Sequence, residues 1–559
     1  MPLNLIITSQ YKKEIFVTLN NTIFITKQFM PMNLRKIFFA AALLCVCGNK
    51  TFSQGNKFEA LMQMIQYVYV DTVNEKQLTE DAIRAVLKDL DPHSVYIPAE
   101  DLKDANEPLV GNFEGIGIQF NILDDTILVT NTIPGGPSEK VGLLAGDRIV
   151  QIDTSIVAGI KIKNNDVIKK LRGTKGTKVT VHIFRRGETE LLDFIIIRDK
   201  IPLFSVDASY IVAPGIGYIR LNKFSDATVE EFREAMNKLK GEGMKSLILD
   251  LQMNGGGYLN RAVELADEFL DDKKRIVYTQ GEHQPRQENF ATSAGGWEKG
   301  KLVVLIDEGS ASASEIVSGA VQDWDRGLIV GRRSFAKGLV QKPFQLPDGS
   351  AVRLTVARYY TPSGRCIQKK YEKGDKGDED YDLDLYNRQK SGELFSADSI
   401  HFSDSLKYFT NAKRVVYGGG GIMPDVFVPL DTSMVSNYYR DLQRKGILNE
   451  FTLSYVDENR SSLNANYKNV AQFKKNFLTD VAFMGKFFAF AEKKEVKKDE
   501  IGYKTSTVHL QTQLKALIAR NLWNNDAYFQ IFNDISNTFQ KAVECIKDNT
   551  FDRMKIAEK

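Results

Sequence analysis

The sequence predicts a multidomain α/β protein with a helical lead-in, a small β-rich domain, an α/β domain and a helical carboxy-terminal domain. The chain has 559 residues, which is enough for about three or four domains at roughly 150 residues each. Its 43% hydrophobic and 26% charged residues are typical of a folded protein. The spacing of the apolar residues changes along the chain from helical to strand-like, then to an alternation of both, and then back to helical.

Composition also excludes several classes of function. With 74 basic and 71 acidic residues the net charge is only +3, so no overall field attracts nucleic acid and no such partner is expected. Four cysteines are too few for a disulfide framework and lack the paired spacing of a zinc site. We therefore expect neither a metal nor another cofactor, and the function must reside in a local site.

Residues 32–54 have the layout of a secretory signal. A basic pair, Arg35 and Lys36, precedes an apolar run at 37–47 and then a polar stretch. These eleven residues make about 16 Å of helix, which is too short to span a hydrocarbon core of about 30 Å. We therefore expect an exported protein, free in a periplasm or held at the periplasmic face of the cell envelope.

The position of this signal also bears on the start of the protein. An export signal normally begins at its own methionine, so we expect the true start at Met30 or Met32 and interpret 1–54 as a misassigned leader followed by a signal peptide. Two alternatives remain, a buried amphipathic segment and a lipid anchor on Cys45 or Cys47. The lipid anchor is the weaker one, because large apolar residues precede both cysteines.

The next two regions differ in periodicity. Residues 55–100 have apolar positions at helical spacing, which predicts two helices before the turn Asp91-Pro92-His93-Ser94. Residues 101–198 contain short β-rich runs separated by Gly and Pro, which predicts one small β-rich domain. The predicted strands lie at 116–120, 126–131, 148–152, 178–185 and 189–197.

Residues 199–430 alternate between strands and helices, which predicts an α/β domain with parallel pairing. The strands are expected at 216–221, 246–251, 301–306 and 328–330, and the helices at 228–240, 260–269 and 313–324. A charge run at 371–384 is most simply a solvated loop, since the Gly and terminal Glu of a calcium loop are not in place.

Residues 431–559 are expected to form a helical carboxy-terminal domain, with the strongest helical periods at 470–491 and 507–546. Its aromatic stripe is more typical of a helix core than of a ligand site. The sequence does not reveal what this domain does.

A candidate nucleophile lies in the segment 307–315, Asp-Glu-Gly-Ser-Ala-Ser-Ala-Ser-Glu, between a predicted strand and a predicted helix. Small residues at such a turn expose a hydroxyl, here that of Ser312, beside free helix amides that can hold an oxyanion. The commoner interpretation is a capping box, with Glu315 three residues after Ser312. A suitable base therefore has to decide between the two.

Lys337 is the candidate base. Its neighbours are small or apolar, and burial lowers the pKa of a lysine because it disfavours the ammonium. The neutral amine then accepts the serine proton, and Gln341 is placed to orient it without adding charge. None of the five histidines lies in the α/β segments flanking Ser312, so nothing favours a Ser-His-Asp triad.

A glycine-rich turn at 254–257 follows another predicted strand. Three glycines let backbone amides approach a ligand closely, as in phosphate or oxyanion cradles. A nucleotide site is the alternative, but neither GxGxxG nor a Gly-Lys-Ser/Thr ending is present. Oxyanion stabilisation together with Ser312 is the better interpretation.

At these residues the sequence resembles the C-terminal processing peptidases, also called tail-specific proteases, from about 58 to 429. The shared motifs include Leu-Asp-Pro-His-Ser at 90–94, Gly-Ile-Gly-Ile at 115–118, Gly-Asp-Arg-Ile at 146–149, the segments 250–257 and 309–315, Lys337-Gly338 with Gln341, Tyr-Thr-Pro-Ser-Gly-Arg at 360–365, and Gly421-Ile422 with Pro424-Asp425. The resemblance implies a serine endopeptidase with a crotonase-like ββα core.

The resemblance also implies roles for individual residues. Ser312 is the nucleophile, Lys337 the general base and Gln341 its support, while the amides of Gly256 and Ala313 form the oxyanion hole. The β-rich region is a PDZ domain that binds apolar protein carboxy termini. Its peptide-binding residues are Gly115, Ile116, Gly117, Ile118 and Phe120, and Arg148 couples peptide occupancy to the active site.

Some features depart from the family pattern. Gly255 replaces a usual Pro, and about 50 residues at 369–417 are inserted between segments that are nearly adjacent in shorter relatives. This insertion and the carboxy-terminal domain are candidates for restricting access, for binding an adaptor or for self-association. The alternative function is a non-catalytic PDZ carrier or chaperone on the same fold, which needs neither Ser312 nor Lys337.

Overall fold

The computed structural model describes residues 55–372, 381 and 383–556, with side chains from Lys57 onward. The predicted leader and signal peptide, and most of the charge run at 371–384, lie outside the described residues. The chain divides into two compact units, Met1–Ala85 and Val86–Lys559. None of the helices in the described part combines the length and hydropathy that a membrane span requires.

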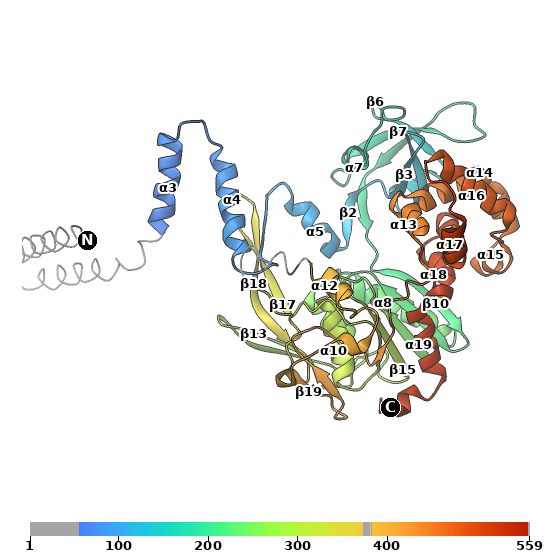
Figure 1. Cartoon of the computed structure of the whole chain (residues 1–559). Coiled ribbons are helices and arrows are strands. Elements are labelled where there is room, and N and C mark those ends of the chain that lie inside the picture. The colour runs from blue at the N-terminus through green and yellow to red at the C-terminus, as the bar shows by residue number, and fades with distance from the viewer. Residues whose placement is uncertain (1–54, 373–380, 382, 557–559) are drawn as a thin grey trace, which may run out of the picture. The chain divides into compact units, whose positions relative to one another are not determined.

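The two helices expected before the Asp91 turn are present (Figure 1). They are α3, Gly55–Val68, and α4, Glu75–Lys88. Asn74 caps α4, because its side chain accepts a hydrogen bond of 3.1 Å from the Gln77 amide. After the turn, the short strand β1 (Val95–Ile97) and helix α5 (Leu102–Val110) lead into the β-rich domain.

The β-rich domain, expected to be a PDZ domain, is an antiparallel sheet with the strand order β3-β4-β5-β7-β8, so β3 lies at an edge. The strands are β3 (Ile118–Leu123), β4 (Thr126–Thr132), β5 (Arg148–Ile152), β6 (Ser155–Ile156), β7 (Lys178–Phe184) and β8 (Leu192–Ile197), with helices α6 (Pro137–Lys140) and α7 (Asn164–Leu171). Strands β2 (Asn112–Gly115) and β9 (Asp199–Pro202) pair where the chain enters and leaves the domain.

The α/β domain contains a six-stranded sheet with the order β10-β11-β12-β15-β16-β21. Every pair is parallel except β10 with β11. The strands are β10 (Val206–Ala213), β11 (Ile216–Leu221), β12 (Ser246–Asp250), β15 (Lys301–Ile306), β16 (Leu328–Gly331) and β21 (Val426–Phe427). The central strands are almost wholly apolar because helices cover both faces of the sheet.

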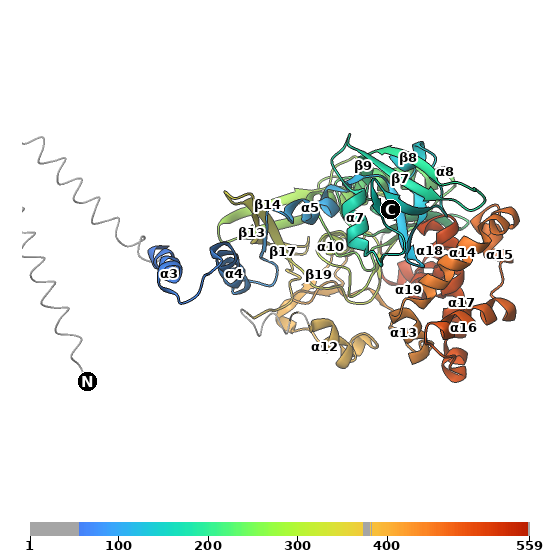
Figure 2. The same cartoon turned by 90° about the horizontal axis from the view of Figure 1, so that it is seen from above.

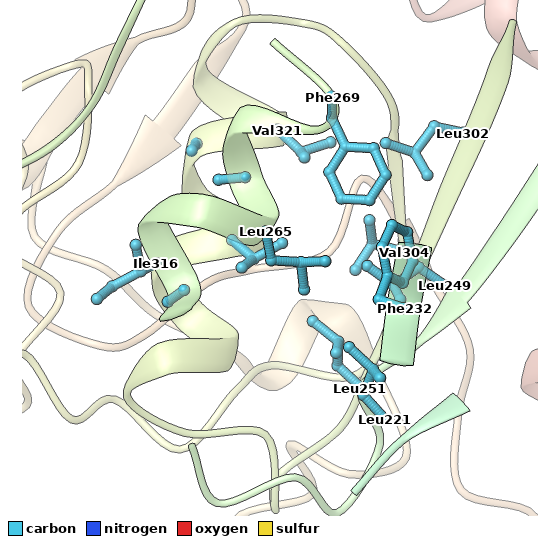
Figure 3. Packing of buried hydrophobic residues seen from close by; sticks show 14 of the residues in the cluster. Leu221, Phe232, Leu249, Leu251, Leu265, Phe269, Leu302, Val304, Ile316 and Val321 are labelled. Carbon is cyan, nitrogen blue, oxygen red and sulfur yellow. The ribbon is translucent and has the colours of Figure 1, made fainter. Parts of the chain in front are cut away.

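Three helices pack against one face of this sheet, as Figure 3 shows for Leu265 facing Leu249 and Val304. These helices are α8 (Thr228–Gly241), α9 (Leu259–Asp267) and α10 (Ala313–Asp323). Each lies within about two residues of the helix expected from the sequence. The helix that carries the candidate nucleophile at its start is therefore held by the main hydrophobic core.

A second, five-stranded antiparallel sheet was not expected from the sequence. Its order is β1-β18-β13-β14, with β17 also paired to β18. The added strands are β13 (Arg275–Gly281), β14 (Gln284–Phe290), β17 (Leu339–Gln345) and β18 (Ala351–Tyr360). The sequence of β14, QPRQENF, has no apolar alternation, so periodicity does not identify it as a strand.

The carboxy-terminal region is helical, as predicted (Figure 2). Its helices are α13 (Asn437–Arg444), α14 (Ile447–Asn466), α15 (Val470–Asn476), α16 (Val481–Lys493), α17 (Glu500–Leu522), α18 (Asn525–Phe532), α19 (Asn537–Lys547) and α20 (Thr550–Arg553). The run expected at 470–491 is two helices, since the Asp480 side chain caps a new one at the Phe483 amide.

The aromatic stripe of this region is core, as the sequence indicated, with Phe473 and Phe487 fully buried. Helices α18 and α19 instead pack against the second face of the six-stranded sheet. There Phe539 contacts Tyr218 edge to face at 5.3 Å, and Asp526 accepts a hydrogen bond from the Ser209 amide. The end of the chain therefore completes the sandwich around the parallel strands.

The inserted segment 369–417 carries helix α12 (Asp384–Lys390), the 3-10 turns η2 (Ala397–Ser399) and η3 (Asp404–Leu406), and the hairpin β19 (Lys407–Phe409) and β20 (Val415–Tyr417). Cys366 and Cys545 are both free thiols. No disulfide is formed among the described residues.

Candidate active site

Ser312 lies at the turn between β15 and α10, immediately before the helix begins at Ala313. Its backbone has φ 55 and ψ −109, a conformation that a residue with a side chain adopts only when its surroundings hold it there. Ser312 is half-buried while both of its neighbours are buried. The Ser312 hydroxyl is therefore the part of this otherwise buried turn that a substrate could reach.

The buried carboxylate of Glu315 connects this turn to the loop that carries Lys337. It accepts hydrogen bonds of 2.8 Å from the amides of Ser312, Ala336 and Lys337, and one of 2.5 Å from the Ser334 hydroxyl. Burial raises the pKa of Glu315 to about 7, and these donors oppose the shift. The sequence indicated Glu315 only as a helix cap, whereas it joins the two predicted reactive residues.

Tyr359 makes a second connection between the same two residues. Its hydroxyl lies 2.6 Å from the carbonyl oxygen of Lys337 and 3.1 Å from that of Ser312. The ring is fully buried, and burial raises the pKa of the phenol well above its usual value, so the group remains a donor. Glu315 thus holds the amides of both residues and Tyr359 holds their carbonyls, which we call the catalytic frame.

The side chain of Lys337 is in the environment that the sequence predicted. Burial lowers its pKa, while the negative charges of Glu315 and Asp91 oppose that shift. Among the described residues, however, the amine of Lys337 and the hydroxyl of Ser312 are not joined by a hydrogen bond. The catalytic frame therefore fixes the two backbones, while no hydrogen bond in the described structure joins the two side chains.

Gln341 contacts a different partner from the one expected. Its side-chain amide donates to the Thr355 hydroxyl at 3.2 Å, and Thr355 donates to Asp91 at 2.9 Å. No hydrogen bond from Gln341 to Lys337 occurs in the described part of the chain. The glutamine is thus anchored to β18 beside the lysine loop.

The motif at 90–94 contributes to the same region. Asp91 also accepts hydrogen bonds from the His93 amide at 2.9 Å and from the Ser94 hydroxyl at 2.6 Å. Burial lowers the pKa of His93 to about 4, with a smaller contribution from the charge of Lys337, so the imidazole is neutral near pH 7. The sequence predicted no catalytic role for His93, because nothing favoured a Ser-His-Asp triad, although its motif belongs to the family pattern.

The glycine-rich turn lies directly against the Ser312 turn. A Cβ at Gly256, whose φ is +98, would lie 2.8 Å from the Ser312 Cβ and 2.9 Å from the Ala313 nitrogen, so only glycine fits. The carbonyl of Asn254 joins the two turns, accepting from the Ala311 amide at 3.0 Å and from the Ser314 hydroxyl at 2.8 Å.

The two predicted oxyanion donors differ in availability. The Ala313 amide, at the first position of α10, has no partner among the described residues, as expected for a helix start. The Gly256 amide instead donates to the Asn254 side-chain oxygen at 2.9 Å. It becomes available to a substrate only if that bond opens.

Two of the predicted peptide-binding residues, Ile118 and Phe120, lie on the edge strand β3 of the PDZ sheet, and Ile116 and Gly117 directly precede it. Gly115 ends β2, where it pairs with Asp199 of β9. Gly117 has φ +75, and the amides of Ile116 and Gly117 have no partner within the described chain. Ile118 and Phe120 are half-buried against the core of this domain. The side chain of Ile116 is only 2% exposed and belongs to that core, so it does not line the pocket to which it was assigned.

None of the contacts that Arg148 makes among the described residues reaches the catalytic frame. It pairs with Asp457 of α14 at 2.9 Å, and Arg186 lies 3.0 Å from the same carboxylate. The charge predicted to couple the PDZ domain to the active site therefore contacts the carboxy-terminal helices.

Family models match most of the described elements. Peptidase family S41 matches residues 215–378, and the PDZ domain matches 115–196. Residues 46–101 match the N-terminal domain of the activating protease CtpB, and 438–524 match a family of unknown function. The fold and the site define a serine-type peptidase with a PDZ domain.

Similarity to individual proteins shows which family the chain belongs to. The chain is 38% identical over 344 residues to the carboxy-terminal-processing protease of Bartonella bacilliformis, covering 59% of this chain and 78% of that protein. It is 35% identical to the carboxy-terminal processing protease CtpB of Bacillus subtilis, over 64% of this chain and 73% of the relative. A solved photosystem II D1 C-terminal processing protease is 32% identical over 54% of this chain and 81% of that one, with a TM-score of 0.31. The chain belongs to the carboxy-terminal processing protease family.

Proposed function

We propose that this protein is an exported endopeptidase that binds apolar protein carboxy termini through its PDZ domain and cleaves by a Ser312–Lys337 dyad. The main support is the catalytic frame, since Glu315 and Tyr359 bind the backbones of both residues and of no histidine. The alternative function, a non-catalytic PDZ carrier or chaperone, requires no such arrangement around a strained serine.

In the proposed mechanism, neutral Lys337 accepts the proton of Ser312 as its oxygen attacks the scissile carbonyl. The Ala313 amide donates to the oxyanion, and the Gly256 amide joins it when it leaves Asn254. Lys337 then gives the proton to the leaving amine, and an acyl-enzyme remains on Ser312. Water attacks this ester, Lys337 takes its proton, and the proton returns to Ser312 as the acid product leaves.

The test is cleavage of an unstructured protein with an apolar carboxy terminus. Ser312→Ala and Lys337→Ala should each lower kcat by at least about 10³-fold, whereas Lys342→Ala, a change at an exposed lysine on β17, should not. Folding of all variants is checked by thermal unfolding. Equal cleavage by the parent and the Ser312→Ala protein would overturn the proposal, and binding without cleavage by the parent would favour the carrier.

The pH dependence follows from the state of Lys337. The amine acts as a base only when it is neutral, so kcat should rise with pH. Because burial lowers the pKa of Lys337, the rise should be centred below 10.5, the usual pKa of a lysine. A profile that is flat from neutral to alkaline pH would contradict a lysine base.

The proposal of export rests on the basic pair, apolar run and polar end of residues 32–54. Amino-terminal sequencing of the protein from its own cells should find a mature end near residue 54, with the protein in the periplasmic fraction. Recovery from the cytoplasm with the apolar run intact would contradict export.

A further inference from the structure

The inserted segment 369–417 lies against the loop that leads to Lys337. Arg388 of α12 donates hydrogen bonds to the carbonyl oxygen of Arg333 at 2.6 Å and to that of Ser334 at 3.1 Å. The Arg388 side chain is only 4% exposed. A buried guanidinium that uses its donors on the backbone of another segment holds that segment in one position.

A carboxylate of the same insertion lies beside this buried positive charge. Glu393, which also belongs to the insertion, lies 3.3 Å from Arg388 and accepts from Arg333 at 2.5 and 3.1 Å. Arg333 in turn donates to the Gly420 carbonyl at 2.7 Å. Two guanidinium groups and one carboxylate thus connect the insertion, the lysine loop and the glycine-rich segment after the insertion.

The contacts continue from this cluster to the catalytic frame. Ser334, whose carbonyl accepts from Arg388, donates its hydroxyl to Glu315. The same hydroxyl accepts from the Ile422 amide at 2.7 Å. Glu315 then accepts the Lys337 amide. A displacement of Ser334 therefore reaches the backbone of Lys337 through Glu315 as well as through the chain itself.

A second anchor joins the insertion to the same loop. Lys369 lies 2.9 Å from the Asp384 carboxylate at the start of α12, and its amide donates to the Ala336 carbonyl at 3.1 Å. Its amine also lies 4.3 Å from the centre of the Phe335 ring. The insertion thus contacts each of the residues 333–336, which directly precede Lys337.

We propose that the insertion holds the loop at 333–336 in place and thereby positions Lys337, the proposed general base. Arg388 is the residue of the insertion that does this positioning. This inference rests on the proposed dyad function and goes beyond it, because it assigns a role to residues 369–417, which take no part in the dyad mechanism. Lysine cannot replace Arg388, since an ammonium does not reach two carbonyls and a carboxylate with the geometry of a planar fork.

The experiment compares Arg388→Lys and Glu393→Gln with the control Lys390→Met, a change at an exposed residue of the same helix. The two test variants should lower kcat about tenfold with KM within about twofold. Their pH profiles should also shift to higher pH, because a loosened loop lets water reach Lys337. The control should match the parent in all three quantities.

A second readout does not depend on cleavage. Acetylation of Lys337 is measured against pH by mass spectrometry in the full-length protein, and its midpoint should rise in Arg388→Lys and Glu393→Gln. An unchanged midpoint in both folded variants would overturn the support role even if the protein cleaves normally. Failure of Ser312→Ala to abolish cleavage would instead overturn the dyad, so the two failures are distinguishable.

Discussion

The catalytic turn and the peptide-binding edge of the PDZ domain differ in how their backbone polar groups are used. Around Ser312 and Lys337, amides and carbonyls are bound by the buried side chains of Glu315 and Tyr359. At the PDZ edge, the amides of Ile116 and Gly117 have no partner in the described structure. The comparison teaches that the backbones of the two predicted catalytic residues are held by buried side chains of the protein itself, whereas the PDZ edge keeps amides that a peptide backbone could pair with.

Among the variants that test this difference, Glu315→Gln is expected to have the largest effect on cleavage. A glutamine of the same size has one acceptor oxygen and turns an NH2 group toward the amide donors of the frame. Cleavage measured as kcat should fall about 100-fold, because the backbones of Ser312 and Lys337 lose their common anchor. Glu264→Gln, at a half-buried glutamate of α9 that pairs with Arg261, is the matched control. Normal kcat in a folded Glu315→Gln protein would show that the frame is not needed.

A smaller effect is expected from Tyr359→Phe, which removes one hydroxyl and keeps the buried ring. The Lys337 and Ser312 carbonyls lose their donor, so kcat should fall about tenfold with KM unchanged. Tyr360→Phe is the control, because the Tyr360 ring stacks on the Tyr278 ring, with 4.7 Å between the ring centres, and does not hydrogen-bond to these carbonyls in the described part of the chain. A rise in KM alone would mean that Tyr359 acts on substrate binding instead.

The smallest effect is expected at the PDZ edge. Phe120→Asp removes a half-buried apolar side chain, which should raise KM about fivefold for a substrate with an apolar end. The same variant should leave kcat unchanged, because no part of the catalytic frame is altered. Gln119→Ala, at an exposed position on the same strand, serves as control. An equal loss of kcat would contradict the separation of recognition from reaction geometry.

The sequence predicted those parts of the fold whose signals are local. The strands β12 and β15 are short apolar runs that end at turns, and both were expected within one residue of their observed ends. The polar strand β14 was not predicted, because its side chains are stabilised by pairing with β13 rather than by burial. Local patterns therefore identify buried strands better than strands of an exposed antiparallel sheet.

The residues of the candidate site likewise fall into those that the sequence predicted and those that it did not. Ser312 and Lys337 were identified from small neighbours and from their places after predicted strands. Tyr359, which joins their carbonyls, was not, because it lies on β18, a strand that the sequence did not predict. The contact of Asp91 with Thr355 likewise spans 264 residues. No periodicity records such contacts, and the occupied Gly256 amide is a detail of hydrogen bonding that motifs do not contain.

The dyad itself is tested most directly by covalent labelling with a fluorophosphonate probe followed by peptide mass mapping. The probe reacts with an activated serine oxygen, so the label is expected on Ser312, with a labelling rate that rises with pH. In Lys337→Ala the rate should fall by at least about 10²-fold, because no base removes the serine proton. Labelling at another serine, or an equal rate on Ser312 without Lys337, would contradict the account.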